Sequence, residues 1–287
     1  MNTDIELLVN AINGLKSNGN IIKDYILPIS ISFISAFLGV SVAKMTFRHQ
    51  EKLKLEISKV GIINKYIIRM GEARATLIAI KYNYKELSET HFIGRTLNIP
   101  YIMCLENEMP NNASELSFMV TLSKDYVPCD YNASWANPLR VSMAINNYNQ
   151  AFVILKKRNE LFIDLNNKIS DYRKKNGIPQ HSAITLDLID SLIGRQELVA
   201  LCDLTEKMIS LIDDILFELD DFMVNFPGEA RDKLNQKLIK GYGVVLQYQE
   251  SPFKIWRTLE PDYKIIANLM DVSEDEAKAR YDNGYKR

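Results

Sequence analysis

The side chains that most often carry enzyme chemistry are few in this sequence and stand far apart. None of the histidines or cysteines occurs at the spacing of a zinc site or in a CxxC pair. No glycine-rich phosphate-binding motif and no nucleophile elbow is present. We therefore expect no enzyme, no cofactor and no metal, and the alternative of a hidden active site is limited to residues 91–138. The histidines and cysteines are His49, His91, His181, Cys104, Cys129 and Cys202.

Two acidic pairs could still do chemistry, because carboxylates on one helical face can hold a divalent cation or a cationic partner. Asp213 and Asp214 stand about two helical turns before Asp220 and Asp221. No histidine or neighbouring cysteine would complete a ligand set there. The pattern therefore disfavours a metal and favours pairing with basic side chains.

The charge of the surrounding segments supports that pairing. Residues 184–226 carry two basic and ten acidic side chains, 2 − 10 = −8. The same count gives 10 − 4 = +6 for residues 44–88 and 7 − 3 = +4 for residues 141–175. We expect an acidic helix between two basic ones, an arrangement that reduces repulsion between like charges. The whole chain has a net charge of only −1, which argues against a nucleic-acid partner.

Tyr25–Ala43 is an uncharged segment of 19 residues. At about 1.5 Å per residue, a helix of this length spans roughly 28 Å, close to the hydrocarbon thickness of a bilayer. We predict a single transmembrane helix over residues 25–43. Two alternatives are a core helix or dimer interface of a soluble protein, and a signal peptide cleaved after Ser41-Val42-Ala43.

Charges beside this segment predict its orientation. Basic residues outnumber Glu51 and Glu56 on its C-terminal side, whereas its N-terminal side is slightly acidic. The positive-inside bias therefore places the N-terminus outside an inner or plasma membrane and the large C-terminal part in the cytoplasm. Residues 1–24 are expected to form a short amphipathic segment. The basic residues are Lys44, Arg48, Lys52, Lys54 and Lys59.

Small side chains recur every four residues within the predicted span. Ser35, Gly39 and Ala43 form one such row, and Ser32 and Ala36 form a second row nearby. Small residues at this spacing let two helices approach closely in lipid. We take these five residues as a candidate face for self-association, the alternative being chance in a serine-rich segment.

Apolar residues in three- and four-residue steps predict three long helices beyond the span. The first covers about residues 44–88 and continues the transmembrane helix. The second begins near Val141 and ends near Gly177, and the third runs from about Ala183 to just before Pro227. We predict an all-α fold in which residues 44–226 form a bundle of three long antiparallel helices.

The irregular insert at residues 91–138 contains four prolines and is long for a connection. Its apolar side chains make it the candidate surface for a protein partner. A short helix is expected within it at residues 116–122. The candidate surface residues are Tyr101, Met103, Phe118 and Trp135.

Residues 227–287 are expected to form a small helical extension. Part of it resembles the centre of a helix-turn-helix DNA reader, but Glu274, Asp275 and Glu276 would repel phosphates. Ser273 and Glu276 instead match a capping box that begins a terminal helix. No nucleic-acid partner is therefore expected.

These patterns favour a membrane-anchored helical bundle that acts through protein–protein interaction and self-association. The expected partners are membrane lipid, a second copy of the chain and an unidentified protein. A sensor, a scaffold or an oligomeric membrane effector would fit, and defence- or toxin-like roles belong to that class. The alternatives are a soluble helical interaction protein and an enzyme with a site near residues 91–138.

Overall fold

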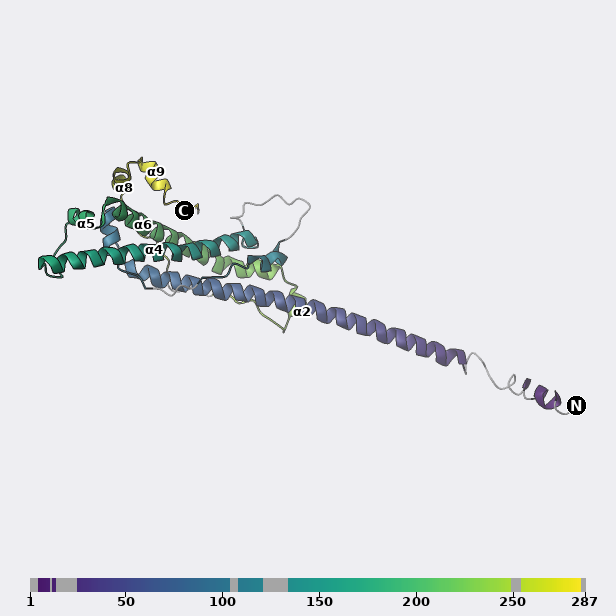
Figure 1. Ribbon diagram of the computed structural model, residues 1–287. Helices are drawn as coiled ribbons and strands as arrows, with labels where there is room; N and C mark the ends of the chain where they lie inside the picture. The colour runs from purple at the N-terminus through teal and green to yellow at the C-terminus, as the bar shows by residue number, and fades with distance from the viewer. Residues whose placement is uncertain are drawn as a thin grey trace. The chain divides into compact units, whose positions relative to one another are not determined.

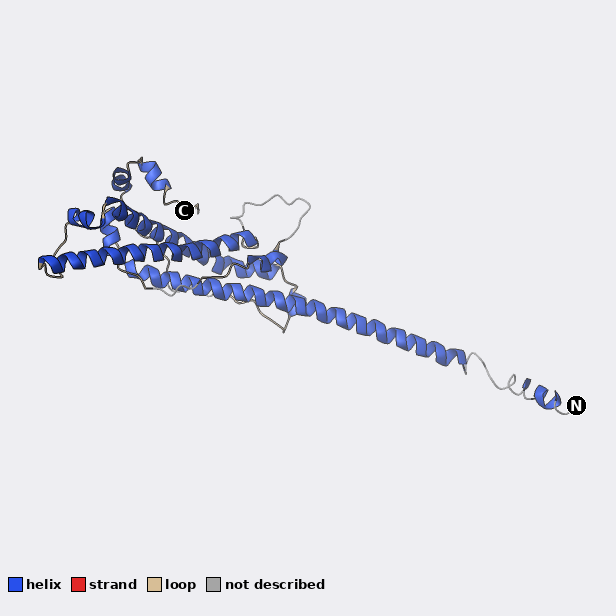
Figure 2. Ribbon diagram, viewed as in Figure 1, coloured by secondary structure: helices blue, strands red, loops and turns tan. Residues whose placement is uncertain are grey.

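A computed structural model describes residues 5–10, 12–13, 25–103, 108–120, 134–248 and 254–284. All regular secondary structure in these residues is helical, which confirms the all-α class (Figures 1 and 2). The chain divides into unit 1, Met1–Ser58, and unit 2, Lys59–Arg287. Residues 5–10 and 12–13, which belong to unit 1, are helical and exposed.

One helix, α2 (Leu27–Lys81), contains both the uncharged segment and the basic segment after it. The predicted continuity of these two segments is confirmed. Pro28 stands in the first turn, where a missing amide hydrogen breaks no helical bond. Beyond Lys81 the chain makes a short 3-10 turn, Tyr82–Tyr84, so the helix ends earlier than the predicted Ser88.

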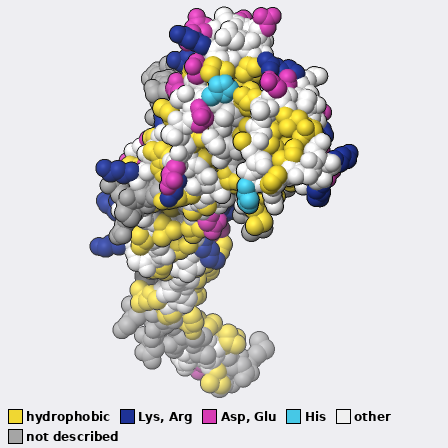
Figure 3. Space-filling model, turned by 90° about the vertical axis from the view of Figure 1, so that its left-hand side faces the viewer, with side chains coloured by type: hydrophobic (Ala, Val, Ile, Leu, Met, Phe, Trp, Pro, Cys, Tyr) yellow, Lys and Arg dark blue, Asp and Glu magenta, His cyan; other side chains and the backbone are white. Residues whose placement is uncertain are grey.

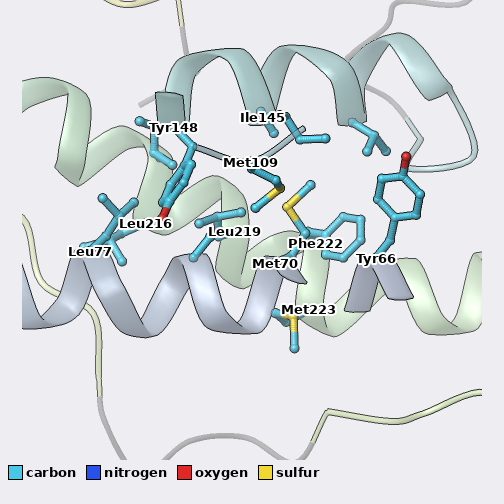
Figure 4. Close-up of a cluster of buried hydrophobic side chains, with 14 of the residues drawn as sticks. Tyr66, Met70, Leu77, Met109, Ile145, Tyr148, Leu216, Leu219, Phe222 and Met223 are labelled. Carbon is cyan, nitrogen blue, oxygen red and sulfur yellow. The ribbon is translucent and has the colours of Figure 1, made fainter. Parts of the chain in front are cut away.

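The core of unit 2 is built from α2 and two further long helices. The predicted apolar rows point inward, and side chains such as Met70, Leu77 and Phe222 are almost fully buried (Figure 4). Burial of each such side chain contributes roughly 1.5–3 kcal/mol relative to exposure, which explains why the rows determine the packing. The two further helices are α4 (Pro138–Asn176) and α6 (Arg195–Asp232).

Helix α6 is antiparallel to α2. Arg74 of α2 pairs with Asp220 of α6, and Lys81, two turns later, pairs with Asp213. Residue numbers therefore rise along one helix as they fall along the other, as Figure 1 shows.

Helix α6 is also antiparallel to α4, since Arg140 pairs with Glu218 whereas Arg158 contacts Thr205. Helices α2 and α4 consequently run in the same direction, so the prediction of a bundle of three long antiparallel helices is wrong for this consecutive pair. The physical reason is the insert, which carries the chain back along the bundle before α4 begins.

The described residues of the insert, 91–103, 108–120 and 134–138, are more regular than predicted. It contains α3 (Phe92–Asn98) and a 3-10 helix, η3 (Ala113–Met119). The expected short helix at residues 116–122 thus lies three residues earlier and is 3-10 in type. Leu116 and Met119 of η3 are fully buried against the bundle, and this burial holds the turn in place.

The third predicted helix has different ends from those expected. A short helix, α5 (Leu186–Ile193), comes first, and Gly194 with φ of 86° separates it from α6. Helix α6 then continues through Pro227 to Asp232, so the predicted end before Pro227 is wrong. Phe226 and Ala230 are fully buried on either side of this proline, and their packing offsets the hydrogen bond that proline cannot make.

The C-terminal piece packs on the bundle as part of unit 2. Its last two helices share a second apolar core with α3, α5 and α6, which includes Leu201 and Ile266, whereas Ile239 packs in the first core. The capping box of Ser273 and Glu276 is confirmed. The helices are α7 (Gln236–Ile239), α8 (Tyr263–Met270) and α9 (Glu274–Ala279).

Candidate functional site

Most acidic side chains of α6 are matched by a cation from another segment. The four carboxylates considered for a metal are all in such ion pairs, and no group of metal ligands occurs among the described residues. The predicted packing of an acidic helix between basic ones is therefore confirmed in its contacts. The pairs are Asp203–Arg280, Glu206–Arg95, Asp213–Lys81, Asp214–Arg257, Glu218–Arg140, Asp220–Arg74 and Asp221–Arg140.

The Arg95–Glu206 pair is the most deeply buried of these. Arg95 donates two parallel hydrogen bonds of 2.7 and 3.0 Å to the Glu206 carboxylate, and a third of 3.0 Å to the carbonyl of Glu89. The side chains are 0% and 3% exposed. Burial raises the pKa of Glu206 and outweighs the opposing effect of Arg95. This pair fixes α3 against α6.

A second buried cluster lies at the end of α2. The Lys81 ammonium pairs with Asp213, donates to the Thr258 hydroxyl at 3.1 Å and lies 4.9 Å from the Trp256 ring centroid. Burial lowers the pKa of Lys81, against the effect of Asp213. Burial also raises the pKa of the neighbouring Tyr84 well above its usual value. Lys81 thus ties the segment after residue 253 to both α2 and α6.

A pocket of about 80 Å³ opens between α6 and the C-terminal piece. Arg95, Glu206, Asp213 and Arg257 line it together with Tyr281. Both arginines are already paired with carboxylates of α6, so neither offers an uncompensated charge to a ligand. The space has room for a few water molecules. These four charged side chains are all in ion pairs, so they do not indicate a class of ligand.

The candidate self-association face lies on α2. At about 100° per residue, Ser32, Ser35, Ala36, Gly39 and Ala43 fall within an arc of about 100°. All five are exposed, and a Cβ added at Gly39 would meet nothing within 4 Å. The structure therefore brings the predicted residues onto one open face.

The helix that carries this face is long and apolar enough to cross a membrane, and none of its most apolar window is buried inside the chain. Within the described residues it is the one helix that meets this test. The Ser32 hydroxyl donates 2.8 Å to the carbonyl of Pro28, so this polar group is satisfied within the helix.

The candidate partner surface is only partly a surface. Tyr101 and Met103 are exposed, and Phe118 is half-buried against the core. Trp135 is 1% exposed, so its predicted surface position is wrong. Its indole N–H donates 2.8 Å to Asp221, because the end of the insert folds back over α6.

The histidines and cysteines do not assemble into an active site in the described residues. Glu72 and Glu108 line a polar pocket of about 150 Å³ beside the insert, but His91 is not among its lining residues. Cys202 is buried, and burial raises the pKa of its thiol to about 12, so it is unsuited to nucleophilic chemistry. Cys104 and Cys129 lie outside the described residues.

Arg158 is a buried residue that the sequence analysis missed. It donates to the backbone carbonyls of Thr96 (3.2 Å), Ile99 and Pro100 (2.7 Å), and so caps the C-terminal end of α3. Burial lowers its pKa to about 10. The signal was a gap in the apolar row of α4, where a seven-residue step from Leu155 to Phe162 leaves one inward position for Arg158.

The same signal applies to α2. Its apolar row steps seven residues from Met70 to Leu77, and the inward position between them holds the buried Arg74. A charged residue at a gap in an apolar row therefore predicts a buried cation with a partner on a facing helix. On the face that Figure 3 shows, charged side chains of both signs are interspersed.

No protein-family model matches the chain, and neither a curated protein nor a solved structure matches it with statistical significance. The functional argument therefore starts from the exposed apolar segment of α2 and from the distribution of charge.

Proposed function

We propose that this protein is anchored in a membrane by residues 25–43 and acts through contacts with other proteins, including a second copy of itself. The observation that carries the proposal is the exposure of every side chain in this uncharged segment. Exposure of this surface to water would be unfavourable. Contiguous apolar patches of this size mark a membrane-contacting surface or a protein interface. A sensor, a scaffold or an oligomeric membrane effector has this organisation.

The energetics of insertion support a membrane. Ten of the residues are Ile, Leu, Phe or Val, and together they favour insertion by about 3–6 kcal/mol. The helical backbone satisfies its own hydrogen bonds, which lipid requires. The basic residues after Ala43 favour placement of unit 2 in the cytoplasm and of the N-terminus outside.

Fractionation of the full-length protein tests the anchor. Membranes washed with high salt and alkaline carbonate should retain the protein, and only detergent should release it. A control with residues 25–43 deleted should appear in the soluble fraction if it remains folded. Recovery of the intact chain without detergent would contradict the anchor and would favour the alternative of a soluble dimer interface.

The self-association face can be tested with a matched pair of substitutions. Gly39→Ile places a bulky side chain on the small-residue face, whereas Ser41→Ile places the same side chain about 160° away. Close helix contacts in lipid depend on small residues, so Gly39→Ile should convert an oligomer to a monomer and Ser41→Ile should not. Mass determination of the detergent-solubilised proteins checks this. A monomeric wild type, or equal effects of both changes, would refute self-association through this face.

A further inference from the structure

Three basic side chains on α2 have no ion-pair partner among the residues that the structure describes. Lys44, Arg48 and Lys52 are exposed, and no carboxylate lies within ion-pair distance of them among the described residues. Together with Ser41 and His49 they line one open hollow along the helix. We call Lys44, Arg48 and Lys52 the basic face.

The basic face points away from the small-residue face. At about 100° per residue, Arg48 lies about 160° around the helix from Ser32, and Lys44 and Lys52 lie about 40° to either side of it. Two helices that meet through Gly39 would therefore turn their basic faces outward. This arrangement keeps the basic side chains of the two helices apart and directs them toward whatever surrounds the pair of helices.

The position along the helix identifies those surroundings. Lys44 and Arg48 follow Ala43 by roughly 2 and 8 Å, within the headgroup layer if residues 25–43 fill the hydrocarbon layer. Lys52 lies about 14 Å beyond Ala43, and its long flexible side chain can reach back toward the headgroups. His49, at headgroup depth, adds a hydrogen-bond donor that suits a phosphate.

We propose that the basic face binds the headgroups of anionic phospholipids. This inference rests on the proposed membrane anchor. Cations directly after a span attract anionic lipid, and each contributes about fivefold in binding. An acidic protein partner is disfavoured because the three charges lie at or near headgroup depth, where lipid is the nearest source of negative charge.

Lys54 provides a matched control within the same helix. It carries the same charge as Lys52 two residues further on, but it lies about 160° away, on the side of the small-residue face. A general effect of positive charge near the membrane would treat the two lysines alike. A binding face would depend on Lys52 and not on Lys54.

The experiment uses the full-length protein in nanodiscs of mixed phosphatidylcholine and phosphatidylglycerol. Native mass spectrometry measures the ratio of the two lipids retained by the protein. Wild type should retain phosphatidylglycerol preferentially, Lys52→Gln should reduce the preference about fivefold, and Lys54→Gln should leave it unchanged. The triple variant Lys44→Gln, Arg48→Gln, Lys52→Gln should remove most of the preference.

Two results would overturn the proposal: no preference in the wild type, or equal losses in Lys52→Gln and Lys54→Gln. Failure of the anchor is a separate result, seen as a protein that is soluble without detergent. In that case sedimentation with phosphatidylglycerol vesicles decides the matter. Binding that Lys52→Gln weakens and Lys54→Gln does not would support the basic face without the anchor, and absence of binding would refute it.

Discussion

Two regions of this chain differ in whether their basic side chains form ion pairs with other described residues. In unit 2, arginines and lysines from α2, α3, α4 and the C-terminal piece pair with the carboxylates of α6, several of them fully buried. In unit 1, the basic face of α2 has no ion pair with any described residue. Both regions include parts of the same helix, so the difference comes from what surrounds the charges.

The contrast indicates two different uses of positive charge. A buried cation without a partner is strongly unfavourable, so unit 2 can keep Arg74, Lys81 and Arg95 inside only because α6 supplies carboxylates. An exposed cation has no such requirement and contributes little to folding. The basic face is therefore available to an external partner, whereas the paired cations determine how helices fit together.

Loss of one buried carboxylate should produce the largest effect. Glu206→Gln leaves the guanidinium of Arg95 buried without a counter-charge and should lower the free energy of unfolding by about 3–5 kcal/mol. Chemical denaturation of the detergent-solubilised protein, followed by the fluorescence of Trp135 and Trp256, measures this change.

The control for this prediction is the double variant Arg95→Met, Glu206→Leu. It removes both charges and should recover most of the lost stability, because an apolar pair of similar size avoids the desolvation penalty. A small effect of Glu206→Gln alone would show that Arg95 is less isolated from water than the structure indicates, and would weaken the comparison.

A smaller effect is expected from acid at the attachment of the C-terminal piece. Burial tends to raise the pKa of Asp203, but hydrogen bonds from Arg280 and Lys207 outweigh it and hold the pKa below its usual value near 3.8. A carboxylate with a lowered pKa stabilises the fold above its unfolded pKa, and this contribution is lost as pH falls through the folded value.

Stability should therefore fall by about 1–2 kcal/mol as pH decreases from about 5 to below the lowered pKa of Asp203. Asp203→Asn should be less stable than wild type at pH 6 and should lack this part of the acid dependence. Denaturation curves at several pH values measure both. Parallel pH profiles for the two proteins would exclude Asp203 as the source.

The smallest effect should come from the basic face. The triple variant Lys44→Gln, Arg48→Gln, Lys52→Gln removes no intrachain ion pair, so its free energy of unfolding should stay within about 0.5 kcal/mol of wild type. The same denaturation assay measures it. A larger loss would show that these cations support folding, and the contrast between the two regions would disappear.

Local patterns predicted much of this architecture. Apolar rows with three- and four-residue steps located the buried faces of α2, α4 and α6, and the charge of each segment predicted which helices would meet. The predicted ends of the helices were less accurate. Helix α6 continues through Pro227 because packing stabilises it on both sides of this proline. The C-terminal end of α4 was correct, since Gly177 adopts the left-handed conformation that such an end requires.

The sequence by itself determined the helical class, the uncharged segment and the excess of acid on α6, because each depends on residue types at short separations. Only the tertiary structure decided that α2 and α4 run in the same direction, that Trp135 is buried and that Arg95 meets Glu206. These features depend on how the insert returns along the bundle. Contacts between residues about 110 positions apart leave no periodic trace in either segment, so they emerge only when the helices pack.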